Sequence, residues 1–137
     1  MEEKNKEKEN RPKFDFEKLQ GFLANNPSFT EKDGAKAIFS LGVLVQLVFS
    51  IQQANLRSTP FESKLKGLHL SAKDVNRIFK DSVEKVNQYT NQYTYKDLRE
   101  FIAENLIIHK PEIDKMSNNE ISFNFVCGLE LGRKFKS

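Results

Sequence analysis

Six basic residues in one segment of this sequence are its clearest candidates for a binding site. Between positions 57 and 80, basic side chains exceed acidic ones by four, whereas between positions 81 and 131 acidic side chains exceed basic ones by four. The six cations are Arg57, Lys64, Lys66, Lys73, Arg77 and Lys80. A cluster of this kind attracts a polyanion such as the phosphate backbone of a nucleic acid. These six residues are therefore the predicted nucleic-acid-binding site.

Three of the six cations recur at helical spacing. Lys73, Arg77 and Lys80 follow the spacing i, i+4, i+7, which places them along one face of a helix. The opposite face of that helix carries the apolar residues Val75, Ile78, Phe79, Val83 and Val86. Packing of the apolar stripe would turn the cations outward, and an ordinary solvated face without a ligand is the open alternative. Because no aromatic side chain is interleaved among the cations, we expect backbone contact without sequence preference instead of base stacking.

Residues that could carry out catalysis are few and scattered. His69 and His109 lie 40 residues apart and match no metal-ligand spacing. Cys127 falls among apolar residues, and a single cysteine forms neither an intrachain disulfide nor a cysteine metal site. No glycine pattern resembles a phosphate-binding loop. The sequence predicts a protein that is not an enzyme and that holds no metal or cofactor; a small enzyme whose site another subunit completes is the alternative.

The composition predicts one all-helical domain. A chain of 137 residues is long enough for a single core, and only 6 Gly and 4 Pro favour helices over a loop-rich β fold. Residues 1–13 mix five basic and four acidic side chains without an apolar period, which predicts a disordered charged tail. Residues 14–137 are then a single domain, a compact bundle of about five helices.

The distribution of apolar residues indicates whether the protein is exported or spans a membrane. The N-terminus lacks the apolar stretch of a signal peptide, and the single cysteine fits a reducing environment, so we expect a cytoplasmic protein. The longest apolar run, Ala37 to Ile51, is too short for a bilayer and predicts a buried core helix. Because this helix is apolar around most of its circumference, neighbours must cover it on several sides.

Hydroxyl residues that are followed three positions later by an acid mark four helix starts. These pairs are Thr30/Asp33, Ser71/Asp74, Thr94/Asp97 and Ser117/Glu120. Together with a short first helix that begins near Phe14, they predict helices over about 31–55, 72–90, 95–109 and 118–135. Pro111 is expected to stop the fourth of these five helices.

Two smaller features each admit two interpretations. Gly128 and Gly132, four residues apart in the last helix, allow another backbone to approach closely. Helix packing within the chain is the favoured interpretation, and a contact between subunits is the alternative. Tyr89, Tyr93 and Tyr95 cluster where two helices meet, and we interpret them as a packed corner in preference to a stacking platform for bases.

The apolar and small-residue landmarks resemble a known family. The landmarks are the stretch FSLGVLVQLVFSIQQANLRSTPFESKLKGLHL, the following capped helix with VNRIFKDSVEKVNQY, and the final NEISFNFVCGLELGRKF. Over about residues 35–136 they resemble the C-terminal region of the large subunit of type I-B CRISPR interference (Cascade) complexes. That region is similar to the small subunit of these complexes, which can be made as a separate polypeptide from an internal start within the large-subunit gene.

The resemblance implies a non-catalytic small subunit of such a complex. A subunit of this kind is a helical bundle, present in several copies, that helps to hold guide RNA, target DNA and the displaced strand. Its partners would be the other subunits and copies of itself, with no membrane. The nucleic-acid contacts of the family come from basic surface residues that the helical landmarks do not align with particular positions here, so the resemblance adds no site residue to the six cations. The alternative function is a helical protein-interaction adaptor without nucleic-acid contact, with the Gly128/Gly132 face as a surface for its partners.

Overall fold

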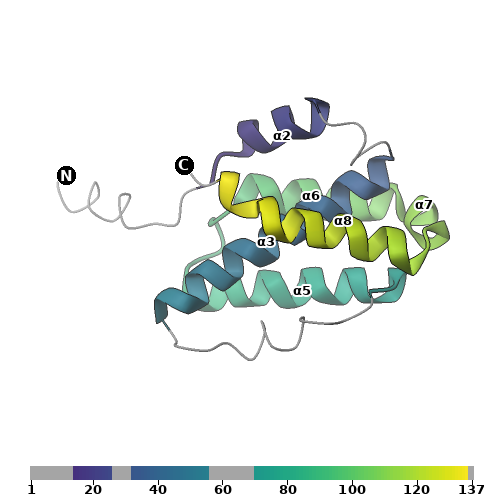
Figure 1. Cartoon of the computed structure of the whole chain (residues 1–137). Helices are drawn as coiled ribbons and strands as arrows, with labels where there is room; N and C mark the ends of the chain where they lie inside the picture. Colours follow the sequence, from purple (N-terminus) through teal and green to yellow (C-terminus); the bar gives the residue numbers. More distant parts are fainter. Residues whose placement is uncertain (1–13, 26–31, 56–69, 136–137) are drawn as a thin grey trace.

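A computed structural model gives the fold and describes residues 14–25, 32–55 and 70–135 (Figure 1). Within these ranges every regular element is a helix, which confirms the all-helical class. In chain order the elements are α2 (Phe16–Asn25), α3 (Asp33–Asn55), α5 (Ala72–Tyr89), α6 (Lys96–Ile108), α7 (Lys110–Lys115), α8 (Asn118–Leu131) and the 3-10 helix η1 (Gly132–Phe135). The predicted tail, residues 1–13, lies outside the described ranges.

Helix α3 is the centre of the core. Every residue from Ala37 to Phe49 is buried. The helix runs diagonally between α5, α6 and α8 in Figure 1, and it packs most extensively against α8. The expectation that the apolar run of this helix is too short for a bilayer is wrong, because the stretch Asp33–Ile51 is long and apolar enough to cross a membrane; 89% of it, however, is buried inside the molecule. The predicted core helix is therefore confirmed, because neighbours enclose it on several sides.

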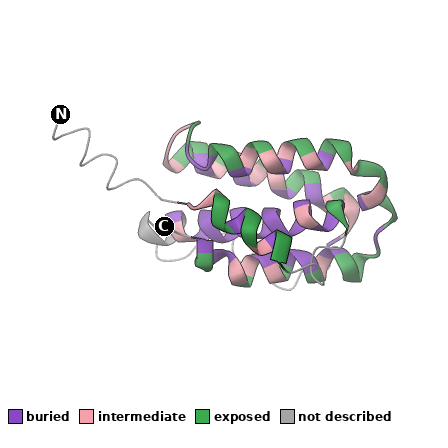
Figure 2. Ribbon diagram, turned by 90° about the horizontal axis from the view of Figure 1, so that it is seen from above, coloured by how far each residue is buried: buried purple, intermediate pink, exposed green. Residues whose placement is uncertain are grey.

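The helices around α3 are amphipathic and turn their apolar faces toward it. Helix α6 buries Leu98, Ile102 and Leu106, one residue per turn, and the outer sides of the surrounding helices are exposed (Figure 2). The last helix departs from a simple stripe, because Phe123 and Val126 of α8 are 57% and 46% exposed. The chain thus leaves some large apolar side chains outside its core.

Glycines allow α3 and α8 to cross at close range. A Cβ atom at Gly128 would overlap the carbonyl oxygen of Phe39, and one at Gly42 would overlap the carbonyl oxygen of Phe125. A Cβ at Gly132 would lie 2.8 Å from the Cβ of Gln46. Packing within the chain is therefore the correct interpretation of Gly128 and Gly132. The face that we assigned to the adaptor alternative is covered by α3 and cannot receive a partner.

Two of the four predicted helix starts are confirmed. Helix α8 begins after Ser117, whose hydroxyl accepts a hydrogen bond from the Glu120 amide at 3.1 Å. Helix α5 begins after Ser71, and Asp74 completes a capping box there. In both cases residues three apart satisfy first-turn groups locally, which explains why the sequence alone located these starts.

The predicted start at Thr94 is wrong by one residue. The residue that precedes α6 is Tyr95, with a left-handed φ of 58°. The Asn91 side chain organises the turn instead, because its Oδ1 accepts from the Tyr93 amide at 2.8 Å. An Asn side chain that bonds the backbone two residues later forms a compact turn, which competes with a hydroxyl cap.

A distant residue caps α3. Thr30 lies outside the described residues, and Asp33 is the first residue of the helix. The Gly34 amide donates to Oε1 of Glu112 at 2.6 Å, so a carboxylate of α7 satisfies a first-turn group of α3. A Cβ at Gly34 would lie 2.9 Å from that same oxygen, so the glycine makes room for the contact.

The fourth predicted helix ends before Pro111, as expected, since the last residue of α6 is Ile108. After a break at His109 the chain enters the short helix α7, with Pro111 in its first turn. Proline is tolerated there because a first-turn amide has no partner within its own helix. The short helix α7, which contains Pro111, was not predicted from the sequence.

The tyrosine corner is packed only in part. Tyr95 is buried, and its ring meets Phe14 edge to face at 6.1 Å. Burial raises the pKa of the Tyr95 hydroxyl. Tyr89 is half-buried, whereas Tyr93 is 67% exposed. The packed interpretation therefore holds for Tyr95 and Tyr89 but is wrong for Tyr93.

Candidate nucleic-acid interface

The start of α5 fixes the position of the predicted cationic row. Ser71 has extended backbone angles, and the Asp74 carboxylate accepts from its amide at 2.9 Å and from its hydroxyl at 3.1 Å. The hydrogen bond from the Ser71 backbone holds the pKa of Asp74 below its usual value. A carboxylate in the first turn also interacts favourably with the positive end of the helix dipole.

The packing of α5 against α3 determines which side of α5, and therefore which of its side chains, faces the solvent. Val75, Ile78 and Val86 are buried, together with Ser82, whose hydroxyl donates to the Ile78 carbonyl at 2.7 Å. This buried face leaves the other side of the helix to solvent. Three of the four cations of α5 are exposed there, namely Lys73, Arg77 and Lys80, whereas Lys85 is half-buried.

The row consists of one paired cation and two free ones. Nη2 of Arg77 lies 2.8 Å from Oδ1 of Asp74, and the Arg77 side chain is still 65% exposed. Within the described ranges, neither Lys73 nor Lys80 lies within ion-pair distance of a carboxylate. Exposed ion pairs contribute little free energy, so Arg77 can exchange its partner for another anion.

An acid shares this face with the cations. Glu84 is exposed four residues after Lys80, which places it one turn further along the same side of α5. Asn87 and Gln88, both exposed, continue that side. The i, i+4 spacing of Lys80 and Glu84 already indicated that Glu84 lies on this side of the helix. The segment of positive charge was defined over residues 57–80 only, and Glu84 lies beyond its end. The row is therefore cationic over the first half of α5 only.

The other three predicted site residues, Arg57, Lys64 and Lys66, lie outside the described residues. Their position relative to Lys73, Arg77 and Lys80 therefore stays a prediction. What the structure brings together is the α5 row, which we call the cationic row: Lys73, Arg77 and Lys80.

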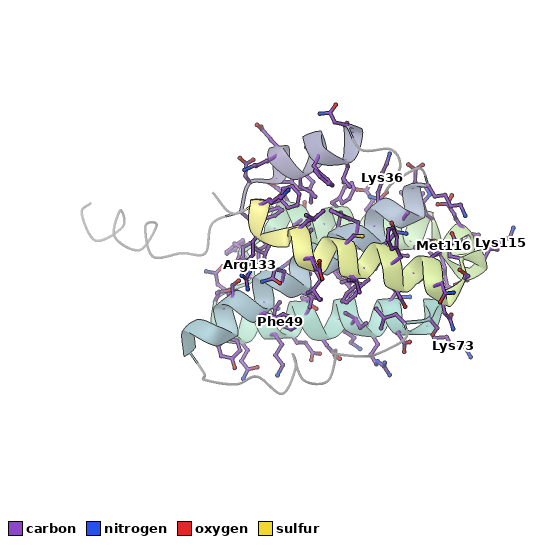
Figure 3. The ribbon with its side chains drawn as sticks, viewed as in Figure 1. Lys36, Phe49, Lys73, Lys115, Met116 and Arg133 are labelled. Atoms are coloured by element: carbon purple, nitrogen blue, oxygen red, sulfur yellow. The ribbon has the colours of Figure 1, made fainter. Side chains whose placement is uncertain are left out.

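A further cation is held in place near the C-terminal end of α8. With its amide oriented to satisfy both neighbours, buried Gln46 donates to the Leu129 carbonyl at 2.9 Å and accepts from Nε of Arg133 at 3.1 Å. Arg133 and the neighbouring Lys134 are exposed. Figure 3 shows Arg133 and Lys73 toward opposite ends of the molecule. The spacing of the sequence could not reveal this anchor, because it depends on the crossing of α3 and α8.

The residues considered for catalysis do not converge. His69 lies outside the described residues, and Nε2 of His109 lies 3.9 Å from Oδ2 of Asp33. Burial, and then the neighbouring Glu130 carboxylate, raise the pKa of the Cys127 thiol, which disfavours the reactive thiolate. Among the residues that the structure describes, no group of three His, Cys, Asp or Glu side chains could hold a metal ion.

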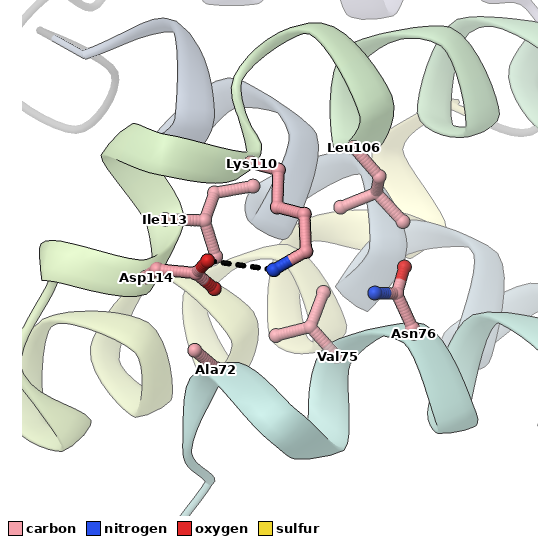
Figure 4. A pocket seen from close by; sticks show the side chains of 7 residues that line it. All are labelled: Ala72, Val75, Asn76, Leu106, Lys110, Ile113 and Asp114. Carbon is pink, nitrogen blue, oxygen red and sulfur yellow. Dashed lines mark hydrogen bonds and ion pairs between the residues drawn. The ribbon is translucent and has the colours of Figure 1, made fainter.

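A small hollow lies where α5, α6 and α7 meet (Figure 4). Its lining consists of Ala72, Val75, Asn76, Leu106, Lys110, Ile113 and Asp114. An ion pair of 2.6 Å between Nζ of Lys110 and Oδ2 of Asp114 lies across it. The space accommodates about one water molecule, far less than the volume of a small-molecule site.

Comparison with known proteins identifies the family. No curated protein and no solved structure matches the chain. Over residues 1–137, however, the chain matches the family described as the C-terminal domain of CRISPR-associated protein TM1802 (cas_TM1802). This match agrees with the resemblance of the helical landmarks to a CRISPR interference protein. Since it covers the whole sequence, the chain belongs to the CRISPR-associated TM1802 C-terminal domain family.

Proposed function

We propose that this protein is a non-catalytic small subunit of a type I-B CRISPR interference complex that binds nucleic-acid backbone without sequence preference. The observation that carries the proposal is the outward cationic row on α5, in which Lys73 and Lys80 have no carboxylate partner among the described residues. Membership in a CRISPR-associated family supports a role beside other proteins of the same system.

The geometry of the row suits a phosphate chain. Lys73 and Lys80 are seven residues apart, which is about 10 Å along a helix. Measured along the axis of a duplex, the phosphates of one strand are about 3.4 Å apart, so the row spans about three nucleotide steps. Lys and Arg at helical spacing contact phosphates and carry no direct sequence information. The described part of α5 presents no exposed aromatic side chain on which a base could stack.

The proposed partners follow from the family and from the resemblance of the helical landmarks. They are guide RNA, target DNA and the displaced strand, together with the other subunits and further copies of this chain. The protein would act in the cytoplasm and would stabilise the opened DNA by neutralising phosphates. Chemistry on the nucleic acid would belong to other components, since this chain is proposed to use neither a cofactor nor a catalytic residue.

The test is a charge reversal of the row with a matched control. The row variant is Lys73→Glu, Arg77→Glu and Lys80→Glu; the control is Lys18→Glu, Lys115→Glu and Lys134→Glu, exposed cations on α2, α7 and η1. Both variants change the net charge equally. Binding of a fluorescent oligothymidylate to the full chain is measured across salt concentrations, and circular dichroism verifies the fold of each variant.

We expect the row variant to bind more weakly than the control and to show a shallower salt dependence. For single strands the slope of log affinity against log salt falls by about 0.7 for each phosphate that the protein no longer neutralises. Equal weakening of both variants would mean that overall charge, and not the row, attracts the nucleic acid. An unchanged row variant that still assembles with its complex would favour the adaptor without nucleic-acid contact.

A further inference from the structure

Among the residues that the structure describes, none covers the outer face of α6. Its inner face buries Leu98, Ile102 and Leu106. The opposite side exposes three acids and then two isoleucines, and we call it the α6 face: Asp97, Glu100, Glu104, Ile107 and Ile108. The two isoleucines are 77% and 59% exposed, which is unusual for side chains of this size.

The acids of the α6 face are barely neutralised from within the chain. The guanidinium of Arg99 turns away to bond the carbonyl oxygens of Gln92 and Asn91, both at 3.1 Å. Lys96 lies 3.7 Å from Glu100, an exposed and weak pair. For Asp97 and Glu104, no cation within the described ranges lies at ion-pair distance. An acidic face of this kind repels phosphates and is complementary to a cationic protein surface.

The chain itself carries a surface with matching spacing. Along α5 the cations are separated by four and then three residues, at Lys73, Arg77 and Lys80. Along α6, read backward, the acids are also separated by four and then three residues, at Glu104, Glu100 and Asp97. Because every residue of an α-helix advances about 1.5 Å, two antiparallel helices would bring all three pairs to the same height.

A fourth pair falls in the same register. When Glu104 lies opposite Lys73, the position opposite Asp81 is Lys96, again of opposite charge. A parallel arrangement would align the ends of the two rows but displace the middle pair by one residue. The antiparallel arrangement is therefore the one that the charges favour.

We propose that the α6 face of one copy packs antiparallel on the cationic row of α5 in a second copy. Within one chain both surfaces point outward from α3, so they cannot meet each other. The contact joins two different surfaces, which leaves a free row at one end and a free α6 face at the other, and further copies can add. A single pair of helices buries less than a standard interface, so the association is weak and sensitive to salt.

This inference does not depend on the proposed function, because it assigns a second ligand to the cationic row. A phosphate chain and a neighbouring α6 cannot occupy the whole row at once. Nucleic acid should therefore compete with self-association wherever both are present.

Two complementary variants test the contact. Variant A carries Lys73→Glu, Arg77→Glu and Lys80→Glu, and variant B carries Asp97→Lys, Glu100→Lys and Glu104→Lys. Each variant alone would oppose like charges at the contact. In a mixture of A and B, every contact between a copy of A and a copy of B would again place acidic side chains opposite basic ones. The measurement is sedimentation velocity of the nucleic-acid-free full chain at about 0.01 M and about 1 M salt, where the Debye length is about 30 Å and 3 Å.

We expect the wild type to self-associate at low salt and to separate at high salt. Variants A and B alone should associate at least about tenfold more weakly, and their equimolar mixture should recover the association. A wild type that stays monomeric at low salt would overturn the inference, as would a mixture that associates no better than its components. Loss of oligothymidylate binding by variant A bears only on the proposed function, so the two ideas fail separately.

Disulfide trapping checks the register in a Cys127→Ser background. The pair Lys73→Cys and Glu104→Cys should yield a ladder of cross-linked copies after oxidation. The control pair Lys73→Cys and Asp97→Cys, which a parallel arrangement would join, should yield markedly less. The reverse result would contradict the antiparallel contact.

Discussion

Single atoms decide how closely α3 and α8 approach each other. Gly42 and Gly128 face the backbone of the partner helix at positions where a methyl group would overlap a carbonyl oxygen. A flexible side chain could move aside, but helix backbone cannot shift without disturbing the whole crossing. These glycines are therefore structural residues of the core and not part of a surface for partners.

Gly128→Ala should destabilise the protein by about 1–3 kcal/mol, as overpacking in a core does. Gly21→Ala is the matched control, because Gly21 is exposed in α2 with no atom near its missing Cβ. The control should be neutral or stabilising by about 0.5–1 kcal/mol, since alanine favours helix. Urea unfolding gives both values. Equal stability of the two variants would refute the close crossing.

The starts of the helices are capped in two ways, either by residues nearby in the sequence or by a residue distant in the sequence. Ser71 and Ser117 begin α5 and α8 through bonds to residues three positions later. For α3, by contrast, the Gly34 amide is satisfied by Glu112, 78 residues away. The first kind of cap makes a helix self-starting, while the second makes its start depend on the folded bundle.

The cap of α5 should make stability depend on pH in the acidic range. The folded-state pKa of Asp74 is lowered, so its stabilisation is present above the unfolded value of about 4 and is lost as the pH falls through the folded value. The free energy of unfolding of the wild type should exceed that of Asp74→Asn at neutral pH, and the difference should shrink in acid.

Ser71→Ala serves as the control for this titration. It removes the hydroxyl that donates to Asp74 but keeps the backbone amide, which is the main cause of the lowered pKa. Most of the pH dependence should therefore remain in Ser71→Ala. A difference between wild type and Asp74→Asn that stays constant with pH would contradict the cap.

The whole molecule is organised around one helix that its neighbours enclose. Leu44 of α3 is fully buried, whereas Ile108 of α6 is 59% exposed. This contrast separates residues that hold the bundle together from residues that are available to a partner. The residue type alone does not tell the two apart, because both are aliphatic side chains within helices.

Leu44→Ala should lower the free energy of unfolding by about 2–5 kcal/mol, because it removes buried methyl groups and leaves a cavity. Ile108→Ala should change it by less than about 0.5 kcal/mol in dilute solution. Both values come from urea unfolding at low protein concentration. A large loss for Ile108→Ala under these conditions would mean that the isolated chain already covers the α6 face.

Local patterns along the chain were sufficient to predict the helical class, the core helix α3 and the outward orientation of the cationic row. Each of these follows from periodicity or from contacts between residues three or four apart, which a helix turns into neighbours. The starts of α5 and α8 were predictable for the same reason. The start of α6 was misplaced because the Asn91 turn competes locally with Thr94, and α7 was missed because a proline in a first turn looks the same as one that ends a helix.

Which surfaces meet, by contrast, depends on the packing of the folded bundle. Crossing of α3 and α8 buries the Gly128/Gly132 face and anchors Arg133 on Gln46, and docking of α7 brings Glu112 to the start of α3. Packing also left Ile107 and Ile108 outside the core. Helical periodicity gives the direction of a side chain relative to its own helix, but it carries no information about which other helix arrives there. That depends on how the chain reverses between helices, and therefore on how all the helices fit together.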